Sequence, residues 1–141
     1  MKDERKFERL SWSEDYSSGL MYLDNHRRNF LDILNELVEV VNEESCETMM
    51  PMVFQRLAFY TEDYFTKKEI AMQECQHLPL HNYRAEHDRL TQAIARFHDE
   101  FRHGAKRVCY DLLVFLIDWF LGYIKTFGPD AAEYLRKRGY E

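Results

Sequence analysis

Four stretches of this chain repeat apolar residues every three or four positions, and this spacing most limits the folds that it can adopt. The apolar positions are Leu23, Phe30, Ile33, Leu37 and Val40 in the first stretch, Val53, Leu57, Tyr60 and Ala71 in the second, Leu90, Ile94, Phe97 and Phe101 in the third, and Leu112, Leu116 and Trp119 in the fourth. Residues three and four apart lie on the same face of an α-helix. Because each helix then has one apolar face to bury, the sequence predicts an all-α bundle of four helices around a common core.

Serine, glycine and proline residues between these stretches predict where the helices begin and end. We expect them to span about 18–42, 48–74 and 80–102, with a fourth that follows a turn at Gly104 and ends near 127. Ser17 or Ser18 would cap the first helix, Pro51 would lie in the first turn of the second, and Gly128-Pro129 would stop the fourth. Short connections between the helices predict an up-down-up-down topology. The whole chain, 1–141, would be one domain: a non-helical arm over 1–17 anchored by Trp12, the bundle over about 18–127, and a short C-terminal helical turn within 129–141.

Six polar or titratable residues occupy places on the apolar faces where core residues are expected. They are His26, Tyr64, Lys68, Tyr83, His87 and Tyr123. A buried polar group costs roughly a few kcal/mol unless it is hydrogen-bonded, and a buried charge costs more. In an antiparallel bundle all six would lie at the same end of the core. We therefore predict a ligand pocket there, and the alternative is that the tyrosines are inert packing residues.

The composition limits the possible partners and location. The 141 residues can bury a full core, and the net charge of −6 gives no electrostatic reason to expect nucleic acid or an anionic membrane. We see neither an apolar run of membrane-spanning length nor a signal peptide in MKDERKFER, so we expect a cytosolic protein. Cys46, Cys75 and Cys109 match no zinc or redox spacing, and we expect them to be reduced packing residues.

Several segments of the chain resemble one family in order and spacing. They are Leu10-Ser11-Trp12-Ser13, Gly19-Leu20 and Leu23-Asp24-Asn25-His26, then Tyr60, Phe65, Glu69 and Met72, then Pro79 followed by Arg84-Ala85-Glu86-His87, and finally Trp119 with Ile124. On these segments the chain resembles the hemerythrins and bacteriohemerythrins over nearly its whole length. The resemblance implies an up-down-up-down bundle that holds two oxo-bridged irons with five histidines, a glutamate and an aspartate.

At the ligand positions that the resemblance implies, only His26 and His87 match the family. Tyr64, Tyr83 and Tyr123 stand where the family has histidines, and Lys68 replaces the bridging glutamate. Gly128 falls where the bridging aspartate is expected, and the nearby Asp130 would be displaced from it. An ammonium about 4 Å from a unit charge costs about 4 kcal/mol at an effective dielectric constant near 20, and iron carries at least two charges. We therefore expect no diiron centre and no diiron oxygen carrier.

Three functions remain open at this point. The leading prediction is a metal-independent binding or regulatory module, without a cofactor, whose altered pocket recognises a small molecule or a protein partner. The first alternative is an oxygen- or metal-binding protein with a reduced or mononuclear iron site made by His26, His87, Tyr64, Tyr83 and Tyr123, because tyrosinate is a good ferric ligand. The second alternative is an enzyme that uses Lys68 as a base or as a Schiff-base nucleophile. We expect a monomer or a weak homo-oligomer with neither nucleic acid nor membrane as partner.

Overall fold

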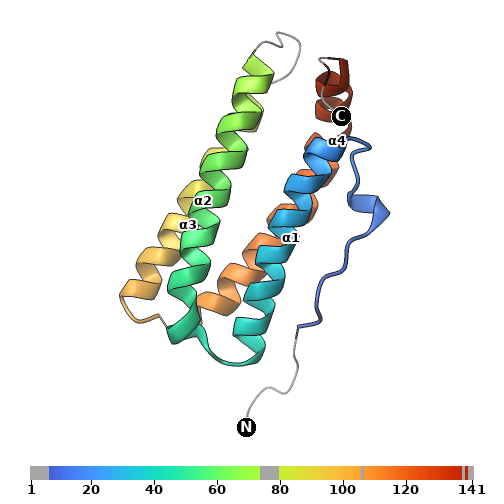
Figure 1. Cartoon of the computed structure of the whole chain (residues 1–141). Coiled ribbons are helices and arrows are strands. Elements are labelled where there is room, and N and C mark those ends of the chain that lie inside the picture. Colours follow the sequence, from blue (N-terminus) through green and yellow to red (C-terminus); the bar gives the residue numbers. More distant parts are fainter. Residues whose placement is uncertain (1–6, 74–79, 106, 138, 140–141) are drawn as a thin grey trace.

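The computed structural model describes the backbone of residues 7–73, 80–105, 107–137 and 139, and the side chains of these residues except 64–73, 80–83, 125–132 and 134. Over this part of the chain the structure contains four long helices: α1 (Met21–Asn42), α2 (Cys46–Gln73), α3 (Leu80–Arg102) and α4 (Val108–Lys137). A short 3₁₀ turn, η1 (Glu14–Tyr16), interrupts the N-terminal arm. Consecutive helices run in opposite directions, and α1 also packs on α4, which closes the bundle (Figure 1). The predicted up-down-up-down four-helix bundle is confirmed.

The core forms where the four apolar faces meet. Its most deeply buried side chains include Leu23, Phe30, Leu34 and Leu37 of α1, Leu57 of α2, Leu90 of α3, and Leu112 and Leu116 of α4. Each such side chain contributes about 1.5–3 kcal/mol through removal from water, so this core is the main force that holds the helices together. None of the helices, as far as the structure describes them, combines the length and apolar character that crossing a membrane requires.

The helix boundaries agree with the prediction for α3 and differ for α1 and α2. The helix α1 begins at Met21 and not at Ser18, because Ser17 and Ser18 bind a carboxylate and do not cap the helix. The Ser17 hydroxyl donates to Asp24 at 2.5 Å, and the Ser18 hydroxyl and N–H both donate to it at 2.7 Å. The helix α2 begins at Cys46, so Pro51 lies in its second turn and not in its first. At this position the proline leaves one backbone hydrogen bond of the helix unmade.

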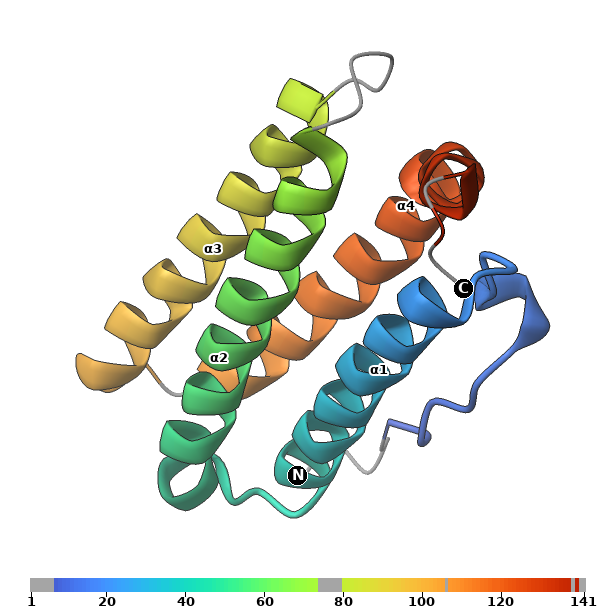
Figure 2. The same ribbon diagram turned by 45° about the horizontal axis from the view of Figure 1, so that its top comes forward.

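The predicted end of the fourth helix at Phe127 is wrong, and residues 129–137 belong to the same helix rather than to a separate turn. The helix α4 continues through Gly128-Pro129 to Lys137, and its last turns point in a new direction (Figure 2). A proline inside a helix bends it and need not end it. Tertiary contacts keep the last turns helical: Leu135 is fully buried, and the Arg136 guanidinium donates to the Gly19 carbonyl at 3.1 Å.

The N-terminal arm lies along α1 and runs antiparallel to it (Figures 1 and 2). The side-chain amide of Asn35 accepts from the Leu10 N–H at 2.7 Å and donates to the Leu10 carbonyl at 2.8 Å. Asn42 holds both backbone groups of Phe7 in the same way, at 2.9 and 2.8 Å. Trp12, the predicted anchor, is half-buried against the core beneath the Arg28 guanidinium, which lies 4.2 Å from the ring centroid. The arm is thus fixed to α1 by polar side chains and an aromatic ring.

Candidate functional site

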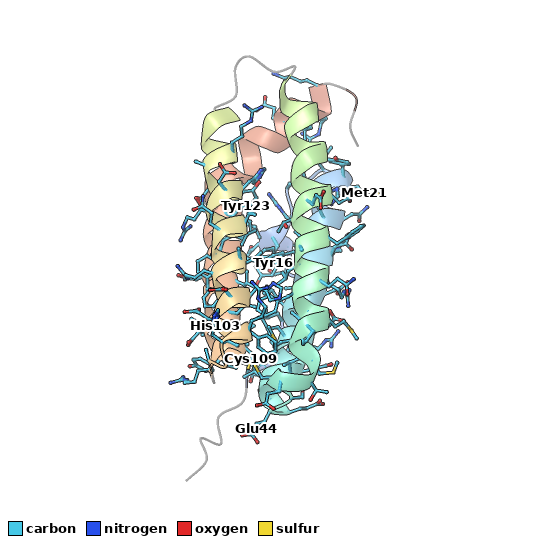
Figure 3. All side chains as sticks on the ribbon, turned by 90° about the vertical axis from the view of Figure 1, so that its left-hand side faces the viewer. Tyr16, Met21, Glu44, His103, Cys109 and Tyr123 are labelled. Carbon is cyan, nitrogen blue, oxygen red and sulfur yellow. The ribbon has the colours of Figure 1, made fainter. Side chains whose placement is uncertain are left out.

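His87 of α3 and Tyr123 of α4 lie together in the core. His87 is 3% exposed and Tyr123 is 6% exposed, and their ring centroids are 6.3 Å apart. Trp119, one turn before Tyr123 on α4, stacks on the Tyr123 ring with a centroid distance of 4.8 Å and an interplanar angle of 18°. Offset stacking of this kind stabilises an aromatic pair beyond the area that it buries. Figure 3 shows Tyr123 in the upper half of the bundle, far from Cys109 and His103 near the lower end.

Aromatic rings from α1 and α2 continue this cluster across the core. Phe30 of α1 lies 5.6 Å from Trp119 and 5.4 Å from Tyr60 of α2, measured between ring centroids. The Tyr60 hydroxyl then donates to the backbone carbonyl of His26 at 2.9 Å. All four helices therefore contribute a ring to one connected cluster, with His87 at one end of it.

A cavity of about 830 Å³ lies between α2 and α3, beside His87. Its floor is made by the buried side chains of Phe54, Thr61, His87 and Ile94. Its rim is made by exposed side chains of both helices: Gln55, Ala58 and Glu62 of α2, and Asp88, Thr91, Ala95 and His98 of α3. This volume is suited to a small organic molecule.

A second cavity, of about 510 Å³, lies between α1 and α2, on another side of α2. His26 lines it and is half-buried, and the Tyr22 ring lies 5.0 Å from the His26 ring. The expectation that His26 is a buried core residue is therefore wrong. The reason is that His26 lies on the part of α1 that borders the groove to α2, where water still reaches it. The exposed Phe59 lines the same cavity.

Among the six residues predicted for the pocket, the structure places three side chains and brings two of them, His87 and Tyr123, together. Tyr64 and Lys68 lie on the helical backbone of α2, and Tyr83 lies on that of α3, but their side chains fall outside the described residues. Gly128 and Asp130 lie within α4, and the Asp130 side chain is likewise outside the described part. The role of these residues stays a prediction. No group of three or more His, Cys, Asp or Glu side chains that could hold a metal ion occurs among the residues described here.

Comparison with known proteins agrees with this architecture. The chain is 22% identical over 125 residues to a bacteriohemerythrin of Methylococcus capsulatus, which covers 85% of this chain and 95% of that protein. It is 21% identical over 113 residues to a bacteriohemerythrin of Clostridium acetobutylicum, which covers 77% of this chain and 87% of that protein. The chain is hemerythrin-like. No protein-family model matches it.

Sequence reasoning about this hemerythrin-like bundle found His87 but missed most of the other residues that line the α2–α3 cavity. Those that were missed include Phe54, Thr61, Glu62, Asp88 and His98. A signal for them was present, because the cavity residues of each helix recur at steps of three and four next to the apolar stripe. From the sequence alone, polar residues that line a cavity cannot be distinguished from polar residues that face solvent. The position of the neighbouring helix is needed to separate the two.

Among the described residues outside the predicted pocket, two titratable groups have shifted pKa values. Burial by itself raises the pKa of the Asp24 carboxyl, but hydrogen bonds from Ser17 and Ser18 and the charge of Arg27 outweigh it and hold the pKa below its ordinary value. Burial, together with the hydrogen bond to Cys46 and the charge of Cys46, raises the pKa of the Cys109 thiol to about 12. Cys46 and Cys109 are free thiols packed in or against the core, as expected, and Cys75 lies outside the described residues.

Proposed function

We propose that this hemerythrin-like protein is a metal-independent module that binds a small ligand, or acts in regulation, through the altered pocket around His87. The other predicted pocket residues are Tyr64, Lys68, Tyr83 and Tyr123, and the sixth, His26, lines the cavity between α1 and α2. The observation that carries the proposal is that buried His87 packs against Tyr123 and at the same time forms part of the floor of an 830 Å³ cavity. A concave site with a buried polar group among apolar walls is the usual form of a small-molecule site.

The residues at the positions that the family uses for iron do not fit a diiron centre. Lys68 would bring a positive charge to the place of the bridging glutamate, and Gly128 has no donor to replace the bridging aspartate. Two histidines without bridging carboxylates make a poor dinuclear site. His26 and His87, the two ligand positions that match, line different cavities. This donor set supports a function that does not use two irons.

The test is the iron content and absorption spectrum of the protein made in iron-rich medium. We expect far fewer than two irons per chain and no oxo-to-iron charge-transfer band. A matched positive control restores the family ligands: Tyr64→His, Lys68→Glu, Tyr83→His and Tyr123→His together with Gly128→Asp. This variant should gain iron if the alignment with the family is correct. Two irons per chain in the unaltered protein would overturn the proposal.

A mononuclear iron site is the second candidate function. It is favoured by the contact between His87 and Tyr123, whose imidazole nitrogen and phenolate oxygen are both good ferric ligands. The same measurement separates it from the leading proposal. One iron per chain, with a visible tyrosinate-to-iron band that the Tyr123→Phe variant loses, would establish this function and displace the metal-independent one.

The proposal also includes location and partners. We propose a cytosolic protein whose partner is a small molecule or another protein, because the net charge of −6 opposes binding to nucleic acid and to anionic membranes.

A further inference from the structure

The two walls of the α2–α3 cavity are stripes of side chains that face each other along antiparallel helices. The α2 stripe runs through Pro51, Phe54, Gln55, Ala58, Thr61 and Glu62, and the α3 stripe through His87, Asp88, Thr91, Ile94, Ala95 and His98. Because the helices are antiparallel, the start of one stripe faces the end of the other. The stack of the Phe54 and His98 rings, with centroids 4.6 Å apart, shows this register. It follows that Glu62 faces the region of His87 and Asp88.

The two ends of the cavity differ in chemistry. At one end Pro51, Phe54 and Ile94 offer apolar surface, and the His98 ring covers Phe54. At the other end Glu62 and Asp88 lie on the exposed rim above Thr61 and His87, which are buried. From Phe54 to Glu62 the helix rises about 12 Å, at about 1.5 Å per residue. The cavity therefore suits an elongated molecule with one apolar end and one polar end.

The charges of the lining residues indicate the sign of the charge that the polar end of the ligand would carry. Glu62 and Asp88 supply two carboxylates, one from each helix, and no lysine or arginine is among the described residues that line the cavity. The ion pairs of the described residues involve other acidic groups, such as Glu86 with Arg89 and Asp99 with Arg102. Two carboxylates on facing walls, with neither lysine nor arginine among the described lining residues, complement a positive charge.

We propose that this cavity binds a small amphiphilic organic cation, with its charged group between Glu62 and Asp88 and its apolar part against Phe54 and Ile94. The inference rests on the proposed function and deepens it, because His87 belongs both to the pocket and to the floor of this cavity. Orientation comes from the carboxylates, and most of the affinity comes from the apolar end, since exposed ion pairs contribute little.

Three probes with the same eight-carbon chain test the charge preference of the full-length protein: n-octylammonium, 1-octanol and octanoate, each below its micellar or solubility limit. Backbone amide shifts in nitrogen-15 NMR spectra report both the place and the affinity of binding. We expect n-octylammonium to shift amides of α2 and α3 along the cavity and to bind roughly threefold to tenfold more tightly than 1-octanol at low salt. Octanoate should bind most weakly, and the preference should shrink at high salt.

Matched variants locate the cation. The double variant Glu62→Gln with Asp88→Asn should bind n-octylammonium no more tightly than 1-octanol. The control Glu47→Gln with Glu100→Gln removes the same number of charges from exposed positions of the same two helices outside the cavity, and it should keep the preference. Ala95→Trp fills the apolar half and should weaken the binding of n-octylammonium and 1-octanol alike.

The outcomes separate this inference from the function on which it rests. Equal binding of all three probes at the cavity, or a preference for n-octylammonium that survives in the double variant, would overturn the proposal of a cationic ligand. The proposal of a ligand-binding module would then still stand. If no probe shifts the amides along the cavity, the proposal of a cationic ligand is overturned as well. The proposed function itself fails on a different measurement, an iron content of one or two irons per chain.

Discussion

The ring of Tyr123 lies stacked on that of Trp119, with centroids 4.8 Å apart and planes inclined by 18°. His87 approaches the same tyrosine ring from α3, so Tyr123 joins α3 to α4 inside the core. The ring accounts for the packing, and the hydroxyl is what distinguishes this residue from a phenylalanine. A phenylalanine at this position would preserve the stack, and this separates a structural role of Tyr123 from a role in binding.

We expect Tyr123→Phe to lower the free energy of unfolding by no more than about 1.5 kcal/mol, the usual net value of one hydrogen bond. Tyr123→Ala should lower it by about 3–5 kcal/mol, because a large buried aromatic ring leaves a cavity. Urea denaturation measures both. If the pocket is functional, Tyr123→Phe should also lose ligand or metal binding while it keeps its fold. A Tyr123→Phe variant as unstable as Tyr123→Ala would contradict the packing seen here.

Lys68→Met tests whether the predicted pocket is kept for function. Apolar replacement of a buried charged group with little change in length is often neutral or stabilising. We expect the variant to be at least as stable as the unaltered protein in equilibrium denaturation, yet to lose its response to a ligand or partner. The neighbouring Lys67→Met serves as the control for adding a methionine to this part of α2. If Lys68→Met alone loses a few kcal/mol, Lys68 is a structural partner of the tyrosines and the functional interpretation is wrong.

The attachment of the N-terminal arm to α1 should depend on Asn35. In Asn35→Ala both backbone groups of Leu10 lose their partner, and we expect a loss of about 1–3 kcal/mol in the free energy of unfolding. Hydrogen exchange of the Leu10 amide should become faster, since its donor would no longer be bound. Asn25→Ala, on the exposed side of α1, is the matched control and should change neither quantity. Unchanged exchange at Leu10 in Asn35→Ala would mean that the arm is held by other contacts.

The contribution of Asp24 to stability should depend on pH in a definite direction. Its pKa in the folded protein lies below the ordinary value of 3.8, so the folded state favours the charged form. The resulting stability is fully present above that ordinary value and is lost as the pH falls through the lower folded pKa. We expect Asp24→Asn to be less stable than the unaltered protein at pH 7 and pH 5, and the difference to narrow below the ordinary pKa. Urea denaturation of both proteins between pH 7 and pH values below 3.8 tests this prediction. A stability difference that grows as the pH falls would contradict it.

The number of helices, the limits of α3 and the helix faces that form the core could all be predicted from the amino-acid sequence. The reason is that the spacing of residues such as Leu90, Ile94 and Phe97 is a local property that a helix turns directly into one buried face. The same spacing brought His87 and Tyr123 into the core as predicted. It also carried the resemblance to the hemerythrins, which the comparisons support.

Features that depend on residues far apart in the chain follow from the fold and not from local spacing. The helix α4 passes Gly128-Pro129, against the local signal, because Leu135 is buried and Arg136 binds the carbonyl of Gly19 from the other end of the sequence. His26 lies at the groove between α1 and α2 and not in the core. Glu62 faces the region of Asp88 in the register of α2 and α3 that the stacked Phe54 and His98 rings show. Periodicity shows which face of a helix is apolar, but the energy of packing against a particular neighbour decides what each polar residue on the border of that face will meet.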